Sequence, residues 1–251
     1  MIKKAILLAA GRGTRMGALT ESTPKPMALV QGKPVLEHIL TGLRDESGVR
    51  DFFIVTGHLA HVIEDYFSDG SRWEIRCSYG RQIALDGTGK APELAKTWLG
   101  SGKEPFFLTY GDILIDPKDY GEMSHGMQDG VDGMIALRQN EDLQQGGAVL
   151  LDENFYLTQI IEKSKDPLPV GQVAWLNAGV YILPTSLFHY TEKLALSPRG
   201  EYELTDALSA MAQDGLKIKG HAIVRRWADV RDPQVLQSLN QEKGETETTT
   251  M

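Results

Sequence analysis

A glycine-rich segment with two arginines follows the first apolar run of the chain. Residues 8–17 read LAAGRGTRMG, and residues 23–26 read TPKP, with Lys25 between two prolines. Glycine allows backbone N–H groups to approach phosphate oxygens closely, and the planar guanidinium of Arg15 can bind phosphate through two hydrogen bonds. We therefore predict that residues 8–17 form a loop around a triphosphate, with positive charge supplied by Arg15 and by the proline-flanked Lys25.

Two better-known phosphate motifs do not fit this segment. A P-loop needs G-x-x-x-x-G-K-[ST], and no Gly-Lys-Ser/Thr follows Gly11 or Gly13 at the required spacing. A dinucleotide fingerprint needs G-x-G-x-x-G at the start of a helix, whereas Gly11, Gly13 and Gly17 give G-x-G-x-x-x-G. The prolines at 24 and 26 also disfavour helix across residues 23–26. The loop is thus expected to bind phosphate without a long helix behind it.

The same segment carries a family resemblance. LAAGRGTRM, followed by LTESTPKPMALVQGKPVLEHIL, resembles the signature of the sugar-1-phosphate nucleotidylyltransferases, the pyrophosphorylases that make nucleotide sugars. Further family-like pieces occur in the same order over roughly residues 3–240: Gln82 with DGTG at 86–89, YGD at 110–112, EK at 162–163, NAGVY at 177–181, ELTD at 203–206 and WAD at 227–229. The resemblance implies transfer of a nucleotidyl group from a nucleoside triphosphate to a sugar 1-phosphate, with release of pyrophosphate.

Such a reaction needs cations rather than a general base. A phosphate monoester is largely dianionic at neutral pH, because its second pKa is about 6, so its oxygen is already a nucleophile. The protein must hold two anions in line and stabilise the charge that develops at the α-phosphorus. In this reading Arg15 and Lys25 are the candidate catalytic residues.

The resemblance also implies a Mg²⁺ cofactor held by two carboxylates. Mg²⁺ typically takes one or two protein carboxylates together with phosphate oxygens. Asp112 ends the apolar stretch PFFLTYGD, and Asp229 follows another expected strand end, beside Trp227, which is a further site candidate. We predict Asp112 and Asp229 as the metal ligands. The turn after Asp229 departs from the family, because VRDP stands where a small Gly-Thr-Pro-like turn is usual.

The remaining expected site residues bind the base, the triphosphate and the sugar. A glutamine amide donates and accepts at once, as uracil and thymine require, whereas glutamate would better suit guanine. LAAGxGTRM, Q-x-x-x-x-G-T-G and YGD resemble most the uridylyltransferases that act on N-acetylglucosamine 1-phosphate, and this resemblance favours UTP as the triphosphate, with dTTP next. The expected nucleotide-binding residues are Leu8, Ala10, Gly11, Gly13, Thr14, Gln82, Gly87 and Thr88. The expected sugar-binding residues are Tyr110, Gly147, Glu162, Lys163 and Asn177.

The elements that must position these residues alternate between strand and helix in the first half of the chain. Apolar patterns predict strands at 3–9, 51–56, 74–78 and 105–110, and helices from residue 34, at 60–67 and at 91–99. This alternation implies βαβ units and a parallel sheet. Beyond about residue 133 come strand-like stretches at 133–137, 147–151, 157–162 and 175–183, then an amphipathic helix around 204–211.

We therefore predict an α/β fold with a Rossmann-like, mostly parallel central sheet flanked by helices. A mixed β/α insertion is expected to form the sugar-side wall of the cleft, as in the nucleotide-diphospho-sugar transferase fold that the resemblance implies. Residues 1–240 are expected to form a single nucleotidyltransferase domain, with a nucleotide-binding half at about 1–132 and a sugar-binding half at about 133–240. The polar residues 241–251 are expected to form a disordered tail.

Composition limits the partners. The 251 residues are 41% hydrophobic and 24% charged, which excludes a disordered, collagen-like or coiled-coil protein. The net charge of −8 argues against nucleic acid or a membrane as partner, although residues 1–34 alone carry +5. With a single cysteine and no apolar run of about 18 residues, a cytoplasmic protein is expected. A homo-oligomer is possible.

Two alternative functions stay open. Short relatives with this signature also include guanylyl- and cytidylyltransferases, and enzymes that act on other phosphates such as phosphocholine. A member of another class would be a catalytically silent subunit that senses nucleotide sugars. The presence of Arg15, Lys25, Asp112 and Asp229 argues against the silent subunit, whereas the unusual turn after Asp229 keeps it possible.

Overall fold

A central sheet carries the fold in the computed structural model, which describes residues 2–139, 143, 146–162 and 173–241. Its parallel part contains β6 (Phe106–Tyr110), β1 (Lys4–Leu8), β4 (Asp51–Thr56) and β5 (Arg76–Arg81), in that order. The three inner strands β6, β1 and β4 are short apolar runs that are mostly buried, as is usual in parallel sheets, whereas the edge strand β5 is polar and only partly buried. The carboxyl ends of β1 and β6 lie level, since Leu8 pairs with Tyr110.

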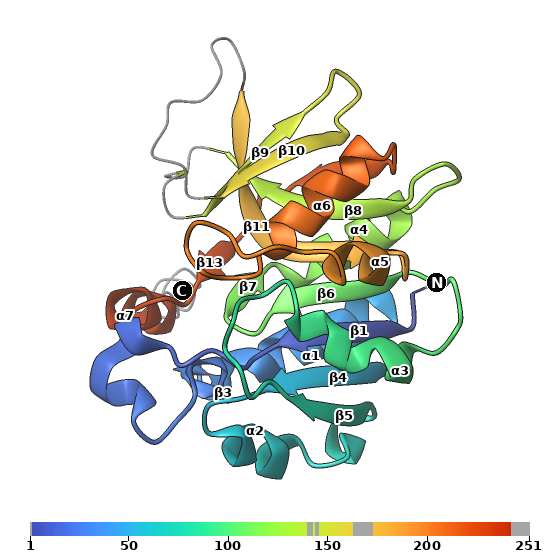
Figure 1. Ribbon diagram of the computed structural model, residues 1–251. Helices are drawn as coiled ribbons and strands as arrows, with labels where there is room; N and C mark the ends of the chain where they lie inside the picture. The colour runs from blue at the N-terminus through green and yellow to red at the C-terminus, as the bar shows by residue number, and fades with distance from the viewer. Residues whose placement is uncertain (1, 140–142, 144–145, 163–172, 242–251) are drawn as a thin grey trace, which may run out of the picture.

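The second part of the chain continues the same sheet. β11 (Ala174–Leu183) pairs antiparallel with β6, with β8 (Gly133–Arg138) and with β9 (Gly147–Leu151). β10 (Leu157–Glu162) pairs antiparallel with β9, and β12 (Ile218–Ala222) pairs parallel with β8. The predicted fold, a mostly parallel sheet with a mixed insertion, is confirmed (Figure 1).

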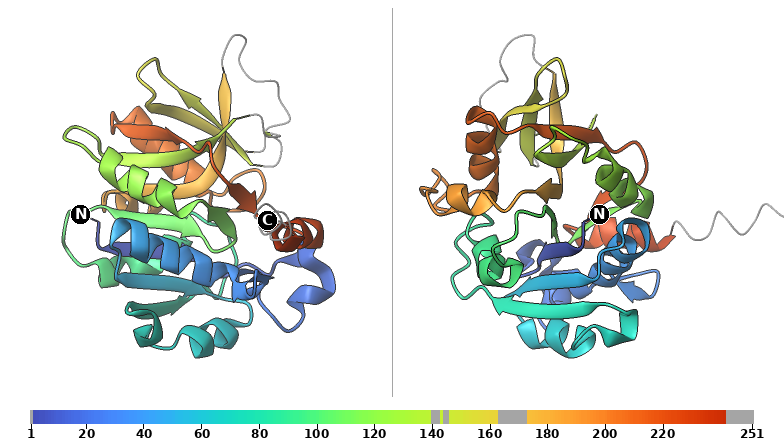
Figure 2. Two further views of the ribbon diagram at one scale, coloured as in Figure 1. Left: turned by 180° about the vertical axis from the view of Figure 1, so that it is seen from behind. Right: turned by 90° about the vertical axis from the view of Figure 1, so that its right-hand side faces the viewer.

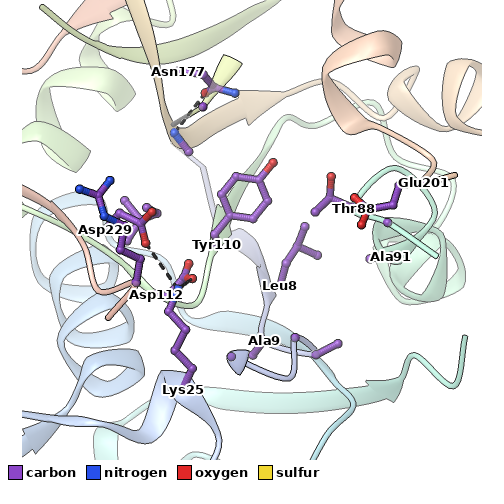
Figure 3. A pocket seen from close by; sticks show the side chains of 18 of the residues that line it. Leu8, Ala9, Lys25, Thr88, Ala91, Tyr110, Asp112, Asn177, Glu201 and Asp229 are labelled. Carbon is purple, nitrogen blue, oxygen red and sulfur yellow. Dashed lines mark hydrogen bonds and ion pairs between the residues drawn. The ribbon is translucent and has the colours of Figure 1, made fainter. Parts of the chain in front are cut away.

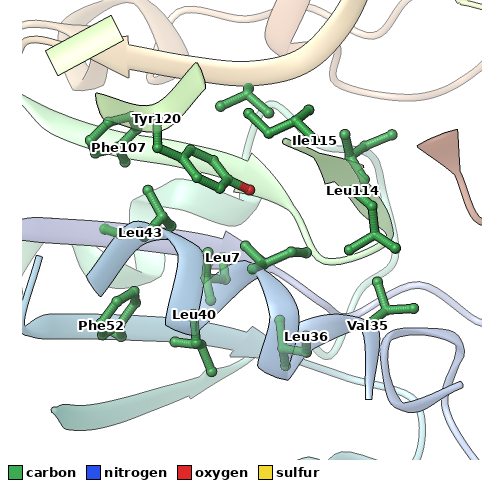
Figure 4. Packing of buried hydrophobic residues seen from close by; sticks show 14 of the residues in the cluster. Leu7, Val35, Leu36, Leu40, Leu43, Phe52, Phe107, Leu114, Ile115 and Tyr120 are labelled. Atoms are coloured by element: carbon green, nitrogen blue, oxygen red, sulfur yellow. The ribbon is translucent and has the colours of Figure 1, made fainter. Parts of the chain in front are cut away.

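Helices cover both faces of the sheet. α1 (Val35–Ser47) and α4 (Pro117–Gly126) lie on one face, while α3 (Lys96–Leu99), α5 (Leu187–Thr191) and α6 (Leu204–Gln213) lie on the other (Figures 1 and 2). Successive strand residues point to opposite faces, so Leu7 packs in the cluster beneath α1 and Ile6 in the cluster on the opposite face. Figure 4 shows Leu36, Leu40 and Leu43 of α1 facing Leu7. This packing anchors β1 from both faces of the sheet.

Small elements complete the chain around the strand ends. α2 (Ala60–Phe67) lies beside β5, and β2 (Leu29–Val30) pairs with β3 (Lys33–Pro34). β7 (Ile113–Ile115) pairs antiparallel with β13 (Trp227–Asp229), which α7 (Pro233–Gln241) follows. Short 3₁₀ helices lie at Thr14–Thr20, Lys25–Met27, Ser71–Trp73 and Ala91–Ala95.

Some expected boundaries were wrong. Residues 25–27 form one 3₁₀ turn, which tolerates Pro26 because a first turn needs no N–H donor there. The strand expected at 74–78 begins and ends later, as β5 at Arg76–Arg81. The helix expected at 91–99 consists of a 3₁₀ segment, Ala91–Ala95, followed by α3 from Lys96. The expected tail, apart from Gln241 at the end of α7, lies outside the described residues.

Among the described residues, no helix has the length and apolar character that crossing a membrane requires.

Candidate active site

A cavity of about 550 Å³ opens where the parallel strands end. Segments following β1, β5 and β6 form one wall, and residues of β9, β10, β11 and β13 form the other (Figure 3). The residues predicted from the sequence lie together in this cavity, except Lys163, which falls outside the described residues: Leu8, Ala10, Gly11, Gly13, Thr14, Arg15, Lys25, Gln82, Gly87, Thr88, Tyr110, Asp112, Gly147, Glu162, Asn177 and Asp229.

Hydrogen bonds within the segment stabilise the conformation of the glycine-rich loop. The carbonyl of Gly13 accepts hydrogen bonds from the Met16 N–H at 2.8 Å and from the Thr20 hydroxyl at 3.2 Å. Gly13 has a φ of +63°, and a Cβ there would lie 2.9 Å from the Cβ of Lys25. Glycine is thus needed at this position for both conformation and space. Met16 is buried while Arg15 stays exposed at the cavity, where it can meet an anion.

Lys25 lies between two carboxylates from distant parts of the chain. Its ammonium forms an ion pair with Asp112 and lies 3.5 Å from Oδ1 of Asp229 (Figure 3). The pairing of β7 with β13 brings the two aspartates together, because the Val230 N–H donates to the carbonyl of Asp112 at 2.9 Å. All three side chains are largely buried, with exposed fractions of 11% for Lys25, 26% for Asp112 and 23% for Asp229.

The electrostatics of this cluster favour a bound cation. Burial raises the pKa of the Asp229 carboxyl, and the neighbouring charge of Asp112 raises it further, while Lys25 and Arg15 oppose the shift. Two adjacent carboxylates are the hard oxygen donors that Mg²⁺ takes alongside phosphate oxygens. The residues therefore fit a divalent ion that would relieve the repulsion between the aspartates.

The expected base-binding residues form a tight turn bonded to the opposite wall. The Gln82 amide donates to the carbonyl of Gly87 at 3.0 Å. The N–H of Tyr202 donates to the carbonyl of Asp86 at 2.7 Å, and the N–H of Gly89 donates back to the carbonyl of Tyr202 at 2.7 Å. Gly87 has a φ of +118°, and a Cβ there would lie 2.7 Å from the Tyr202 nitrogen and closer still to its carbonyl oxygen. The turn therefore depends on glycine at residue 87.

Replacing Gly87 by alanine should destabilise the protein by about 1–3 kcal/mol, because the backbone conformation is strained for any residue with a Cβ and the added methyl meets Tyr202. Urea denaturation followed by circular dichroism measures this loss. The matched control is Gly102→Ala, since a Cβ at Gly102 has no atom within 4 Å. Equal stability of the two variants would show that the turn accommodates a side chain.

The opposite wall presents polar groups where the sugar is expected to bind. Oε2 of Glu162 accepts a hydrogen bond from the Thr205 hydroxyl at 3.3 Å. The Asn177 amide is hydrogen-bonded to the Tyr181 hydroxyl, and its Oδ1 accepts from the Gly179 N–H at 3.1 Å. Tyr110, at the end of β6 on the first wall, also lines this part of the cavity; burial raises its pKa to about 12, so this phenol is neutral at physiological pH. These groups can both donate to and accept from hydroxyl groups.

Several charged residues of the cavity were not predicted as site residues. Arg199 pairs with Glu162 at 3.3 Å, with Glu201 at 2.9 Å and with Glu203 at 3.5 Å, and burial raises the pKa of Glu203. The only sequence signal was the charged run RGEYE at 199–203, immediately before and into the ELTD piece. The additional polar lining residues are Arg12, Arg199, Glu201, Glu203, Thr205 and Arg231, while Trp227, named above as a further candidate, also lines the cavity.

A second group of possible metal ligands lies outside the cavity. Asp119, Glu122 and His221 bring their ligand atoms within 4.8 Å of one another. The guanidinium of Arg225 bonds Asp119 at 3.1 Å and Glu122 at 2.5 Å, so a cation already neutralises this group. We interpret it as an ion-pair network that ties α4 to β12.

Comparisons with known proteins agree with this geometry. A family model described as "Nucleotidyl transferase" matches residues 4–245. The chain is 32% identical over 236 residues to the bifunctional protein GlmU of Methanococcus maripaludis, covering 94% of this chain and 53% of that protein. It is 30% identical over 240 residues to the low-salt glycan biosynthesis nucleotidyltransferase Agl11 of Haloferax volcanii, covering 95% of this chain and 65% of that protein. The chain thus spans about half the length of the GlmU relatives it matches.

The fold is also found in solved structures. A UDP-glucose pyrophosphorylase solved with UDP-glucose superposes with a TM-score of 0.85 at 23% sequence identity, covering 98% of this chain and all of that one. At this identity the likeness concerns the fold. It agrees with the mixed sheet and flanking helices described above.

Proposed function

Because the chain belongs to the nucleotidyl transferase family, we propose that it transfers a nucleotidyl group from UTP, or from dTTP, to a hexose 1-phosphate. The bond that forms joins an oxygen of the sugar phosphate to the α-phosphorus, and the bond that breaks releases pyrophosphate. The observation that carries the proposal is the arrangement of Lys25 between Asp112 and Asp229, in one cavity with the glycine-rich loop.

Each residue group has a distinct task in this mechanism. Backbone N–H groups of residues 11–14 and the guanidinium of Arg15 bind the outer phosphates, which become the leaving pyrophosphate. Lys25 neutralises charge that builds up around the α-phosphorus as the two anions approach. Asp112 and Asp229 would hold Mg²⁺, which would supply further positive charge at the phosphates. No residue is required as a general base, because the sugar phosphate is largely dianionic at neutral pH.

The proposal for uracil or thymine rests on the amide of Gln82. This side chain lies in the cavity beside Gly87 and presents both a donor and an acceptor, as the edge of these bases requires. Asn177 and Glu162, on the other wall, are the proposed contacts for sugar hydroxyls. The UDP-glucose pyrophosphorylase described above was solved with UDP-glucose, which is a uridine nucleotide.

One assay tests the proposed function directly. Pyrophosphate release is measured with Mg²⁺ for UTP, dTTP, GTP, CTP and ATP, each paired with several sugar 1-phosphates and with phosphocholine. Fastest release with UTP or dTTP and a hexose 1-phosphate is expected. Fastest release with GTP or CTP would replace the proposed base preference. Absence of release with every pair, together with nucleotide-sugar binding, would identify a silent sensing subunit instead.

Replacing Gln82 by glutamate should lower the ratio of kcat/KM for UTP to that for GTP at least about tenfold, because a carboxylate cannot donate to a base carbonyl. The same assay measures the ratio. Gln159→Glu is the matched control, since Gln159 is exposed on β10 and does not line the cavity. An unchanged ratio in the Gln82 variant would remove this residue from the base pocket.

A further inference from the structure

The turn after Asp229 carries a cation that the mechanism above does not use. Val230 is fully buried, and its N–H donates to the carbonyl of Asp112 at 2.9 Å. The N–H of Arg231 donates to the carbonyl of Asp229 at 2.8 Å. These bonds hold the backbone of Arg231 next to the paired aspartates, and its side chain lines the cavity.

Arg231 is only loosely paired. Among the residues that the structure describes, its one ion-pair partner is Asp232, with Nε 3.6 Å from Oδ2, which is longer than a hydrogen bond. Oδ1 of Asp232 accepts the N–H groups of Gln234 and Val235 at the start of α7, so this carboxylate has a separate structural role. The side chain of Arg231 is 30% exposed, and its guanidinium is available to an anion in the cavity.

Arg15 and Arg231 come from two different segments of the chain and line the same cavity. Backbone N–H groups lower the pKa of the Asp232 carboxyl, and the charges of Arg231 and Arg15 lower it further. The position of α7 is fixed against the N-terminal segment, because the Asn240 amide donates to the carbonyl of Leu29 at 3.0 Å. Figure 1 shows α7 beside this N-terminal segment. The cavity is therefore flanked by one arginine from the glycine-rich loop and another from the turn before α7.

We propose that Arg231 is an additional phosphate-binding residue of this site. This inference rests on the proposed function and deepens it. A guanidinium binds phosphate through two parallel hydrogen bonds, and a turn made only of small residues would provide no such group. The phosphate has two possible sources, namely the triphosphate with its pyrophosphate product and the sugar 1-phosphate.

Steady-state kinetics in both directions distinguish these sources. Arg231→Gln is expected to raise the KM for at least one phosphate substrate about tenfold, and Arg231→Lys should recover part of the loss. A rise for the triphosphate and for pyrophosphate assigns Arg231 to the outer phosphates. A rise for the sugar 1-phosphate and the nucleotide sugar assigns it to the acceptor. KM values equal to those of the wild type for all four would overturn the proposal.

The control is Arg76→Gln, which removes a cation that is paired with Asp51 at the surface and does not line the cavity. Circular dichroism verifies that each variant is folded. If the wild type releases no pyrophosphate from any substrate pair, the proposed function fails while this inference can still be tested. Calorimetry with inorganic pyrophosphate and with glucose 1-phosphate, each with Mg²⁺, then compares the proteins. Binding about tenfold weaker in Arg231→Gln supports the proposal, and equal binding overturns it.

Discussion

Replacing Lys25 by glutamine should lower kcat by about 10²–10³, the range seen when one preorganised charge-stabilising donor is removed from an active site. The ammonium contacts both Asp112 and Asp229, where the transferring phosphoryl group is proposed to bind and where its charge would need to be neutralised. The KM values should change less than kcat, because this charge develops mainly in the transition state. Initial rates of pyrophosphate release measure both parameters.

The same variant should also be less stable than the wild type, since two largely buried carboxylates then face each other without a cation. Added Mg²⁺ is expected to restore part of the lost Tm, as measured by calorimetric scans with and without the ion. Lys33→Gln is the matched control, because the Lys33 side chain is 59% exposed, its Nζ lies 3.9 Å from Oε1 of Glu37, and it does not line the cavity. A kcat within tenfold of the wild type would exclude a role for Lys25 in phosphoryl transfer.

The second large effect is expected for Asp112→Asn, which keeps the shape of the side chain and removes its charge. The variant should lose at least about 100-fold in kcat, because an amide is a poor ligand for Mg²⁺ beside Asp229. Calorimetric titration with Mg²⁺ in the presence of UTP should show weaker metal binding, which separates metal loss from other damage.

Asp65→Asn provides the control for Asp112→Asn, since Asp65 is exposed on α2 and does not line the cavity. Wild-type turnover and wild-type Mg²⁺ affinity in Asp112→Asn would contradict the metal assignment. Normal Mg²⁺ affinity with low turnover would assign Asp112 to positioning Lys25 instead.

The framework of the sheet could be predicted from local sequence. Four elements have the predicted bounds, because each is a short run of apolar periodicity between clear breaks: Asp51–Thr56, Ala60–Phe67, Gly147–Leu151 and Leu157–Glu162. The elements between 113 and 126 were not predicted. The strand Ile113–Ile115 has three residues, which is too short to show a period, and it is stabilised by pairing with residues 227–229 far along the chain.

The candidate site was predictable to the extent that it follows strand ends. Leu8, Gln82 and Tyr110 lie at or just beyond the ends of parallel strands, which meet at one edge of the sheet. The ion pairs of Arg199 were not predictable, because the pair with Glu162 joins residues 37 positions apart that both line the cavity. In the sequence, Arg231 is only a charged residue in an unusual turn. Its position beside the aspartates follows from the path of the folded chain, which the sequence alone does not reveal.

The backbone bonds between Tyr202 and the turn at residues 86–89 have a consequence for substrate affinity. They join the wall that carries Gln82 to the wall that carries Glu203. Both bonds are between backbone groups. In a protein whose two walls closed only around the ligand, part of the interaction energy would be used to restrict their relative motion. Here, at this end of the cavity, that conformational entropy is lost when the chain folds. Each ligand therefore meets a recess that is preorganised where base and sugar are proposed to lie.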